Sequence, residues 1–247
     1  KGTQMMSMFT QASFEEVNLK NFDTSLVTDM YEMFADCNYL TSLDLSNFNT
    51  KNVKDMGAMF KGCTSLTDIN LKSFDTSNVI DMYNMFMSCT YLTSLDLSNF
   101  NTQNVGDMEG MFMGNARLVS LNIKSFDTKQ VSDMSTLFMN CYNLLELDLS
   151  SFNTGKVYNM SQMFSFASKI KSLDLSNFDT KNVVNMDRMF QNMRELTQLN
   201  VKNFDTSKVE SMQYMFVQCD SLTSLDLSSF VTSNVKDMYG MLFNCKQ

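Results

Sequence analysis

The sequence has no proline and no histidine, only eight glycines, and no long apolar run. Without histidine, the chain lacks the most common general base and the most common nitrogen ligand of zinc. Without proline, or any stretch rich in glycine and serine, it shows no linker between domains. No apolar segment approaches the roughly 20 residues that a helix needs to cross a bilayer, and no secretory leader is visible. These absences argue against a histidine-dependent enzyme, a zinc centre, a multidomain chain and a membrane-spanning segment.

The charge balance is acidic, with a formal net charge of −8 and a pI near 4.5. Proteins that bind nucleic acid need basic stripes that displace counterions from the phosphates. We therefore expect no nucleic-acid partner. The chain begins Lys1-Gly2-Thr3 rather than with methionine, and we expect it to be part of a longer protein.

A repeat of 26 residues runs through the chain, as the interval from Phe22 to Phe48 shows. An unbroken period of this length indicates a solenoid, because each copy forms one turn of a stack and a longer turn would displace every later residue. We expect a single domain over residues 1–247, with a half copy at 1–17, repeats from about 18 to 237, and a half copy to 247. The phenylalanines that mark the copies are Phe22, Phe48, Phe74, Phe100, Phe126, Phe152, Phe178, Phe204 and Phe230.

Each copy divides into two halves that space their apolar residues differently. Between Leu40 and Phe48, the alternation of Leu43 and Leu45 is typical of a strand that sends side chains into one face. In residues 53–63, apolar residues recur every three or four positions, which predicts a short helix or helical turn. The expected fold class is an α/β solenoid, a right-handed stack of about nine 26-residue turns, each with a short parallel strand plus a short helix or helical turn.

The pattern L-x-x-L-x-L-x-x-F resembles a leucine-rich repeat in which phenylalanine stands where asparagine is common. More narrowly, the run SLDLSNFDTKNVVNMDRMF, residues 172–190, resembles the 26-residue repeat of bacterial surface proteins, in the branch of BspA-like leucine-rich-repeat surface proteins. The resemblance covers essentially the whole chain. It implies a leucine-rich-repeat-like solenoid, a cell-surface or secreted location, and a role in adhesion or host contact.

Two kinds of sulfur-bearing side chain recur with the repeat. Methionine fills the columns of Met56 and Met59 in nearly every copy, and its place in an apolar stripe favours a core role over an adaptable binding groove. The six cysteines share one column, in which disulfides between neighbouring turns are geometrically feasible. Cys141, however, has Asn115 and Ala167 as its neighbours in that column, which favours buried free thiols over disulfides or a metal site. The cysteines are Cys37, Cys63, Cys89, Cys141, Cys219 and Cys245.

The outward-facing strand residues alternate between two versions. One copy reads Asn-Leu-Lys, as at Asn70 and Lys72, and the next reads Asp-Leu-Ser, as at Asp96 and Ser98, with one break in the alternation at Asp174. Alternation relieves the repulsion of a continuous carboxylate ladder. It fits a solvated, self-compatible sheet face, and it also fits a ligand surface, because large partners of repeat proteins lie along such a face. The candidate sheet-face residues are Asp44, Lys72, Asp96, Lys124, Asp148, Asp174, Lys202 and Asp226.

Tyrosine provides a second candidate contact surface. Recognition hot spots are enriched in tyrosine, tryptophan and arginine, which the sheet face lacks. The tyrosines instead occupy columns that vary between copies, and this variation predicts that they are exposed. The candidate partner surface comprises Tyr31, Tyr39, Tyr83, Tyr91, Tyr214 and Tyr239.

The interruptions of the repeat gather no nucleophile with a base, although an active site must join unlike groups in one place. We therefore expect no enzyme, no catalytic residue, no cofactor and no metal site. The expected function is a non-enzymatic cell-surface module for adhesion, or for binding a protein or glycan on another cell or matrix. Neither end shows a polar capping repeat. The alternative is therefore a structural protein that assembles with other copies of itself, head to tail, into filaments.

Overall fold

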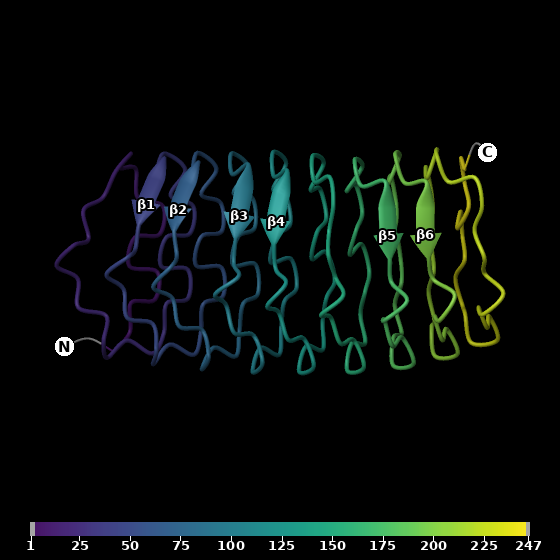
Figure 1. The fold of residues 1–247 in the computed structure, drawn as a ribbon, viewed down its shortest axis with the longest axis horizontal. Coiled ribbons are helices and arrows are strands. Elements are labelled where there is room, and N and C mark those ends of the chain that lie inside the picture. Colours follow the sequence, from purple (N-terminus) through teal and green to yellow (C-terminus); the bar gives the residue numbers. More distant parts are fainter. Residues whose placement is uncertain (1–2, 246–247) are drawn as a thin grey trace.

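The computed structural model describes residues 3–245 as a solenoid whose turns stack along one long axis (Figure 1). The chain passes from one end of the stack to the other without doubling back. Short strands of three residues lie along one side of the stack, and in three of them the central leucine is buried. The strands are β1 (Ser42–Asp44), β2 (Asp68–Asn70), β3 (Ser94–Asp96), β4 (Ser120–Asn122), β5 (Ser172–Asp174) and β6 (Gln198–Asn200).

The strands are parallel, as predicted, but they bond in three separate pairs rather than in one continuous sheet. β1 pairs with β2, β3 with β4, and β5 with β6. The register sets equivalent positions of neighbouring copies opposite each other, for example Leu43 opposite Ile69. The expectation of a strand in every turn is wrong for the turns around Asn18, Asp148 and Asp226, where the described residues form none.

The second half of each copy is not helical, so the expected helix or helical turn is also wrong: none of residues 3–245 lies in a helix. The amide groups of this segment alternate between two acceptors. Those of Ala58 and Phe60 donate to Tyr83 and Met85 in the next turn, at N···O distances of 2.6 and 2.9 Å. The amide of Lys61 instead donates to the carbonyl of Ala58 within its own turn, at 3.1 Å.

This alternation places two residues of each copy in the left-handed backbone region. The φ angle is +52° at Ala58 and +72° at Gly62. A right-handed helix cannot contain such residues, so the three- and four-residue apolar spacing comes from successive tight turns. Isolated parallel bridges then join each turn to the next, from Gln4↔Asp29 to Ser211↔Asp237. We call this second line of contacts the turn ladder.

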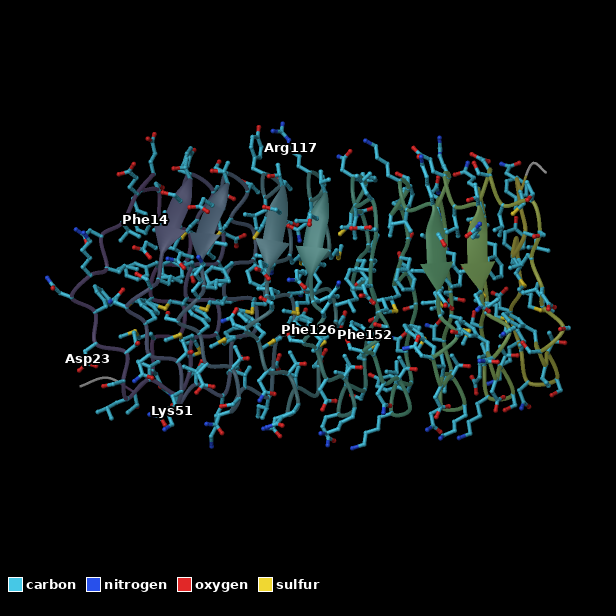
Figure 2. All side chains as sticks on the ribbon, viewed as in Figure 1. Phe14, Asp23, Lys51, Arg117, Phe126 and Phe152 are labelled. Atoms are coloured by element: carbon cyan, nitrogen blue, oxygen red, sulfur yellow. The ribbon has the colours of Figure 1, made fainter. Side chains whose placement is uncertain are left out.

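Apolar side chains fill the space between the strands and the turn ladder (Figure 2). Met56 and Met59 have no exposed surface, which confirms the core role predicted for the methionine columns. Phenylalanine rings stack from turn to turn. The ring centroid of Phe112 lies 6.1 Å from that of Phe86 and 5.7 Å from that of Phe138, with the ring planes within 4° of parallel. Such stacking adds to the large apolar area that each ring buries.

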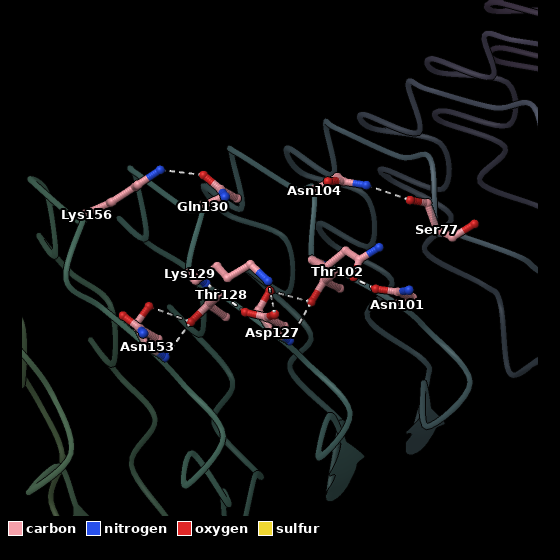
Figure 3. A network of polar contacts seen from close by, with 11 residues as sticks. Ser77, Asn101, Thr102, Asn104, Asp127, Thr128, Lys129, Gln130, Asn153 and Lys156 are labelled. Atoms are coloured by element: carbon pink, nitrogen blue, oxygen red, sulfur yellow. Dashed lines mark hydrogen bonds and ion pairs between the residues drawn. The ribbon is translucent and has the colours of Figure 1, made fainter.

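A buried threonine column connects the turns through their backbones (Figure 3). Thr102 Oγ1 accepts the amide N–H of Asp127 at 2.8 Å and donates to the carbonyl of the same residue at 2.9 Å. Thr128 makes the same two bonds to Asn153, both at 2.8 Å. Each hydroxyl therefore satisfies a donor and an acceptor in the next turn that would be costly to leave unpaired.

The six cysteines are free thiols, as the sequence favoured. Cys89 Sγ donates to the carbonyl of Phe60 in the preceding turn, at 3.1 Å. Asn115 takes the equivalent place in the next copy and donates from Nδ2 to the carbonyl of Phe86, at 2.9 Å. Burial raises the pKa of the Cys89 thiol to about 12, so the S–H donor is retained at neutral pH. Most copies therefore place a hydrogen-bond donor at this position, whereas Ala167 and Met193 fill it without one.

Candidate binding face

The outward residues of the strands and of the equivalent segments in the other turns form one polar surface, which we call the strand face. All of the residues predicted for it are exposed. They are Asp44, Lys72, Asp96, Lys124, Asp148, Asp174, Lys202 and Asp226. The structure therefore brings these eight side chains onto one side of the solenoid.

Side-chain hydrogen bonds on the strand face accompany every strand pair. In each pair, the asparagine Nδ2 of the second strand donates to the aspartate Oδ1 of the first. The three bonds are Asn70 to Asp44 (3.2 Å), Asn122 to Asp96 (2.9 Å) and Asn200 to Asp174 (3.0 Å). A copy of the Asp-Leu-Ser type therefore pairs with the Asn-type copy that follows it.

The same pairing accounts for the turns that lack a strand. In this sequence no aspartate copy precedes Asn18, and no asparagine copy follows Asp226. Asp148 is followed by Asp174, and two carboxylates repel each other where an amide and a carboxylate would bond. The break in the alternation at Asp174 therefore leaves the turn of Asp148 unpaired and begins a new pair at β5.

Changing Asn122 to aspartate is expected to separate β3 from β4. The substitution replaces an amide donor, 2.9 Å from Asp96 Oδ1, with a second carboxylate. We expect a loss of up to about 1 kcal/mol in local stability, seen as faster hydrogen exchange at the amide of Leu97, which donates to the carbonyl of residue 122 at 3.0 Å. Asn153→Asp is the matched control, because aspartate occurs naturally in that column at Asp127. Unchanged exchange at Leu97 would show that the side-chain bond does not decide the pairing.

Where an Asn-type copy is followed by an Asp-type copy, the strand face opens into a shallow groove, which we call a seam groove. In the part of the chain that the structure describes, no backbone hydrogen bond joins segment 67–72 to segment 93–98. Three seam grooves share one plan, with a lysine on one side and an aspartate on the other. They lie between Lys20 and Asp44 (about 210 Å³), Lys72 and Asp96 (about 520 Å³), and Lys124 and Asp148 (about 420 Å³).

The carboxylates of the seam grooves are held in their charged form. The Ser98 amide donates to Asp96 Oδ1 at 3.0 Å, and this bond, with the hydroxyl of Ser98 and the nearby Lys72 ammonium, lowers the pKa of the Asp96 carboxyl. At the next seam groove Lys124 Nζ lies 3.7 Å from Asp148 Oδ2. Each groove thus places a charged carboxylate acceptor on one side and a lysine ammonium donor on the other.

A second row of carboxylates follows the turn ladder. Asp55, Asp81 and Asp107 are partly buried, and each accepts the backbone amide two residues further on at 2.8 Å. Burial raises the pKa of all three carboxyls, and neighbouring carboxylates of the row raise it further. In a later turn Asn185 accepts the same kind of bond from the amide of Asp187, at 2.9 Å.

Replacing Asp81 with asparagine is expected to stabilise the protein at neutral pH. The folded-state pKa of Asp81 is raised, so the ionised carboxylate opposes folding above that pKa, and the penalty disappears as the pH falls through it. Asparagine keeps the acceptor without the charge, as at Asn185. We expect a higher urea midpoint for the variant at pH 7 and a smaller difference below pH of about 4. A difference that stays constant with pH would rule out the electrostatic cause. Asp226→Asn is the control, because hydrogen bonds from Ser228 lower the pKa of that exposed carboxyl.

The structure divides the predicted tyrosine surface among separate places. Tyr39 and Tyr91 are exposed near the strands, and the Arg117 guanidinium lies 3.9 Å from the ring centroid of Tyr91. Tyr31 and Tyr83 are half-buried beside the carboxylates of the turn ladder. Tyr214 and Tyr239 contact each other edge to face, with centroids 5.2 Å apart. The tyrosines therefore form no single continuous patch, and their role in binding remains a prediction.

Sequence reasoning missed three features, which are the threonine column, the pairing of the strands and the position of Arg117. The threonine column was visible as an invariant threonine, for example Thr102 and Thr128, two residues after the marker phenylalanine. The pairing of strands was visible only as alternation of charge. Arg117 covers the ring of Tyr91. It does not break the repeat pattern, so nothing in the sequence indicated this contact.

Within residues 3–245 no three histidine, cysteine, aspartate or glutamate side chains are grouped so that they could hold a metal ion. No helix of a length and hydrophobicity suited to crossing a membrane occurs in the same residues.

These features define a repeat solenoid of parallel turns with a polar strand face. A family profile described as "Mycoplasma protein of unknown function, DUF285" matches residues 2–95, 64–173, 115–202 and 166–247. The chain belongs to this family. No curated protein sequence matches the chain.

Several solved structures resemble the chain. A leucine-rich repeat protein from Eubacterium ventriosum has 19% sequence identity and a TM-score of 0.43, and the match covers 67% of this chain and 43% of that one. A leucine-rich repeat protein from Bacteroides ovatus has 15% sequence identity and a TM-score of 0.35, and the match covers 82% of this chain and 65% of that one. A leucine-rich cell surface protein from Faecalibacterium prausnitzii has 14% sequence identity and a TM-score of 0.33, and the match covers 86% of this chain and 80% of that one. The chain spans less than half of the length of the Eubacterium ventriosum protein.

Proposed function

We propose that the chain is a non-enzymatic repeat module of a cell-surface or secreted protein, of the BspA-like kind, that binds a protein or glycan on another cell or matrix. The observation that carries the proposal is the strand face, where charged and hydroxyl side chains line shallow open grooves along the stack. A surface of this kind gives many weak contacts to a large partner and little enclosure for a small substrate.

The cysteines support a non-enzymatic role. A reactive thiol is partly exposed and has a lowered pKa. In this chain burial raises the pKa of the thiols of Cys141 and Cys219 to about 12, and their Sγ atoms donate to the carbonyls of Phe112 and Phe190. These sulfurs are committed to the packing of the turns.

The proposal is tested by location and by binding. Antibodies against the purified chain should label intact cells of the source organism, and the chain should bind immobilised matrix proteins or glycans. Binding should fall when Lys72 and Lys124 on the strand face are both changed to glutamate. Changing Lys51 and Lys181, which lie outside the strand face, to glutamate gives the same change in net charge and serves as the control. Labelling only after the cells are permeabilised, or equal loss of binding in both variants, would contradict the proposal.

A second candidate, head-to-tail assembly into filaments, is favoured by the two ends of the turn ladder. Among residues 3–245 the amide groups of Met238, Gly240 and Leu242 find no acceptor, although the equivalent amides of earlier turns donate to the next turn. Met6 and Met8 at the other end are about half exposed, at 53% and 49%, and Phe243 is 60% exposed. Unpaired amides at one end and exposed apolar side chains at both ends suit contact with another copy, and they would equally suit a further repeat in a longer chain.

Light scattering over a concentration series distinguishes the two candidates. Self-assembly predicts a molar mass that grows with concentration and fibres visible by negative staining. A molar mass that stays at the monomer value would exclude self-assembly and leave the binding-module proposal standing.

A further inference from the structure

The seam grooves recur at every second turn in the first part of the stack. Lys20, Lys72 and Lys124 occupy equivalent positions in alternate copies, and each faces the aspartate of the next copy across a groove. Neighbouring turns lie at about strand spacing, so the grooves repeat at roughly 10 Å along the axis. A partner that uses several of them must therefore carry its own groups at this interval.

The lining of the grooves combines hydrogen-bonding groups with an apolar floor. Ile69 and Leu121 are partly exposed at the centres of β2 and β4, whereas Leu43 and Leu95 at the centres of β1 and β3 are only 3% and 6% exposed. The Asn-type strand of each pair therefore leaves its central aliphatic side chain accessible beside the seam. A flat, partly apolar ring with polar edges fits this lining better than an aliphatic chain or a single ion.

The polar groups of the grooves suit hydroxyls. In the groove between β2 and β3, Asp96 supplies a carboxylate acceptor, Lys72 a cationic donor and Ser98 a hydroxyl. Several backbone groups of segments 67–72 and 93–98 already have partners, since the Leu97 amide donates to the carbonyl of Asn122 and the Ser98 amide to Asp96 Oδ1, so the side chains supply the polar contacts of this groove. A hydroxyl donates and accepts at once, and so it can use both kinds of group.

The charge of the grooves disfavours polyanions. The groove at Lys72 also contains Asp68 and Asp96, and the groove at Lys124 also contains Glu146 and Asp148. Each of these two grooves thus has one cationic group and two carboxylates. A uronic-acid polymer, a sulfated glycan or a nucleic acid would meet repulsion along the whole face.

From these observations we propose that the seam grooves bind a linear, neutral β-1,4-linked polysaccharide laid along the solenoid axis, with one disaccharide for every two turns. In an extended β-1,4-linked glycan each sugar is turned over relative to the one before, so like groups recur at every second sugar, at a spacing close to that of two turns. This inference rests on the proposed function and names the partner class of the strand face.

Occupying several grooves at once explains how sites without aromatic side chains hold a glycan. One shallow groove gives weak binding, but each further groove is filled from an already tethered chain at a high effective concentration. The affinity is therefore set by the number of disaccharides in register. Glycan binding should strengthen in steps of two sugars, because a single added sugar does not reach the next groove.

The test uses the purified chain and two series of oligosaccharides, β-1,4-linked glucose and β-1,4-linked N-acetylglucosamine, from two to seven sugars long, measured by calorimetry. We expect affinity to rise about tenfold at four and again at six sugars, with odd lengths binding like the even length below. The series that binds identifies the sugar. Maltohexaose, whose α-1,4 linkages do not give an extended chain, should bind at least tenfold more weakly than the matching six-sugar chain.

Two variants locate the binding. Lys72→Ala should weaken binding of the six-sugar chain at least tenfold. Lys51 lies at the lower edge of the view in Figure 2, away from the strands, and Lys51→Ala should leave binding unchanged. Absence of binding in both series, a smooth rise with each added sugar, or equal loss in both variants would overturn the inference. If the chain binds matrix proteins through the strand face but neither series of oligosaccharides, the glycan assignment fails and the proposed function stands. If it binds no partner at all, both fail.

Discussion

Replacing Phe112 with alanine is expected to lower the free energy of unfolding by about 3–5 kcal/mol. The side chain has no exposed surface, and its ring lies between those of Phe86 and Phe138. Its removal therefore leaves a cavity bounded by two turns, and the fixed backbone ladders on both sides limit how far those turns can collapse. Urea unfolding followed by circular dichroism measures the change.

The matched control for this prediction is Phe243→Ala, because that ring is 60% exposed. An exposed site of this kind usually changes stability by no more than about 0.5 kcal/mol. Hydrogen exchange adds a spatial test, since a repeat protein is stabilised by nearest-neighbour contacts. Exchange in Phe112→Ala should accelerate most in the turns of Phe86, Phe112 and Phe138. A loss below about 1 kcal/mol would contradict a tightly packed column.

The second large effect is expected from Thr102→Val. Valine keeps the shape of threonine but removes the hydroxyl that accepts the amide of Asp127 and donates to its carbonyl. Two backbone groups are then left without partners next to a fully buried side chain, at an expected cost of about 2–3 kcal/mol. Thermal or urea unfolding measures the loss.

Thr102→Ser separates the hydroxyl from the methyl group. Serine keeps both hydrogen bonds and loses only a small buried methyl, so we expect about 1 kcal/mol of destabilisation. If serine and valine destabilise equally, packing rather than hydrogen bonding explains the threonine column. The comparison requires no partner molecule, and it is independent of the proposed function.

The sequence was sufficient to predict the solenoid, the parallel strands and the buried columns. The reason is physical: each copy must meet its neighbour in the same way, so residues such as Phe60, Met56 and Val53 recur where the core needs them. The predicted core role of methionine is confirmed for the same reason, since an apolar stripe at a fixed position has only one interior to face.

The helix was predicted wrongly because apolar spacing alone does not distinguish a helix from a series of tight turns. Both return a side chain to the same side after three or four residues. The distinguishing signal is the left-handed residue, and the column of Ala58 does contain Asn84 and Gly110, which favour that conformation. The same column also contains Glu32 and Thr136, and these residues hide the signal when copies are compared.

The candidate site was predictable in composition but not in geometry. The exposed positions of Asp44, Lys72 and Asp96 follow from strand alternation. The grooves do not, because they depend on which neighbour an asparagine amide bonds to. Asn70 lies between Asp44 and Asp96 along the stack, and its amide donates to Asp44. Spacing along the sequence is equal in both directions, so it contains no information on this choice.

The unequal bonding of the two sides of the stack has a mechanical consequence. On the turn ladder every turn is bridged to the next, whereas on the strand face strand pairing joins only three pairs of turns. The seams between the pairs are crossed by isolated hydrogen bonds, such as the one from Asn99 Nδ2 to the carbonyl of Leu71 at 3.1 Å. When the stack is bent away from the strand face, the seams separate first and the ladder acts as the hinge line. Within a pair the strands resist such bending, so deformation is concentrated at the seams. We therefore expect the strand pairs to move as units and the strand face to widen at the seams when the solenoid follows a curved surface.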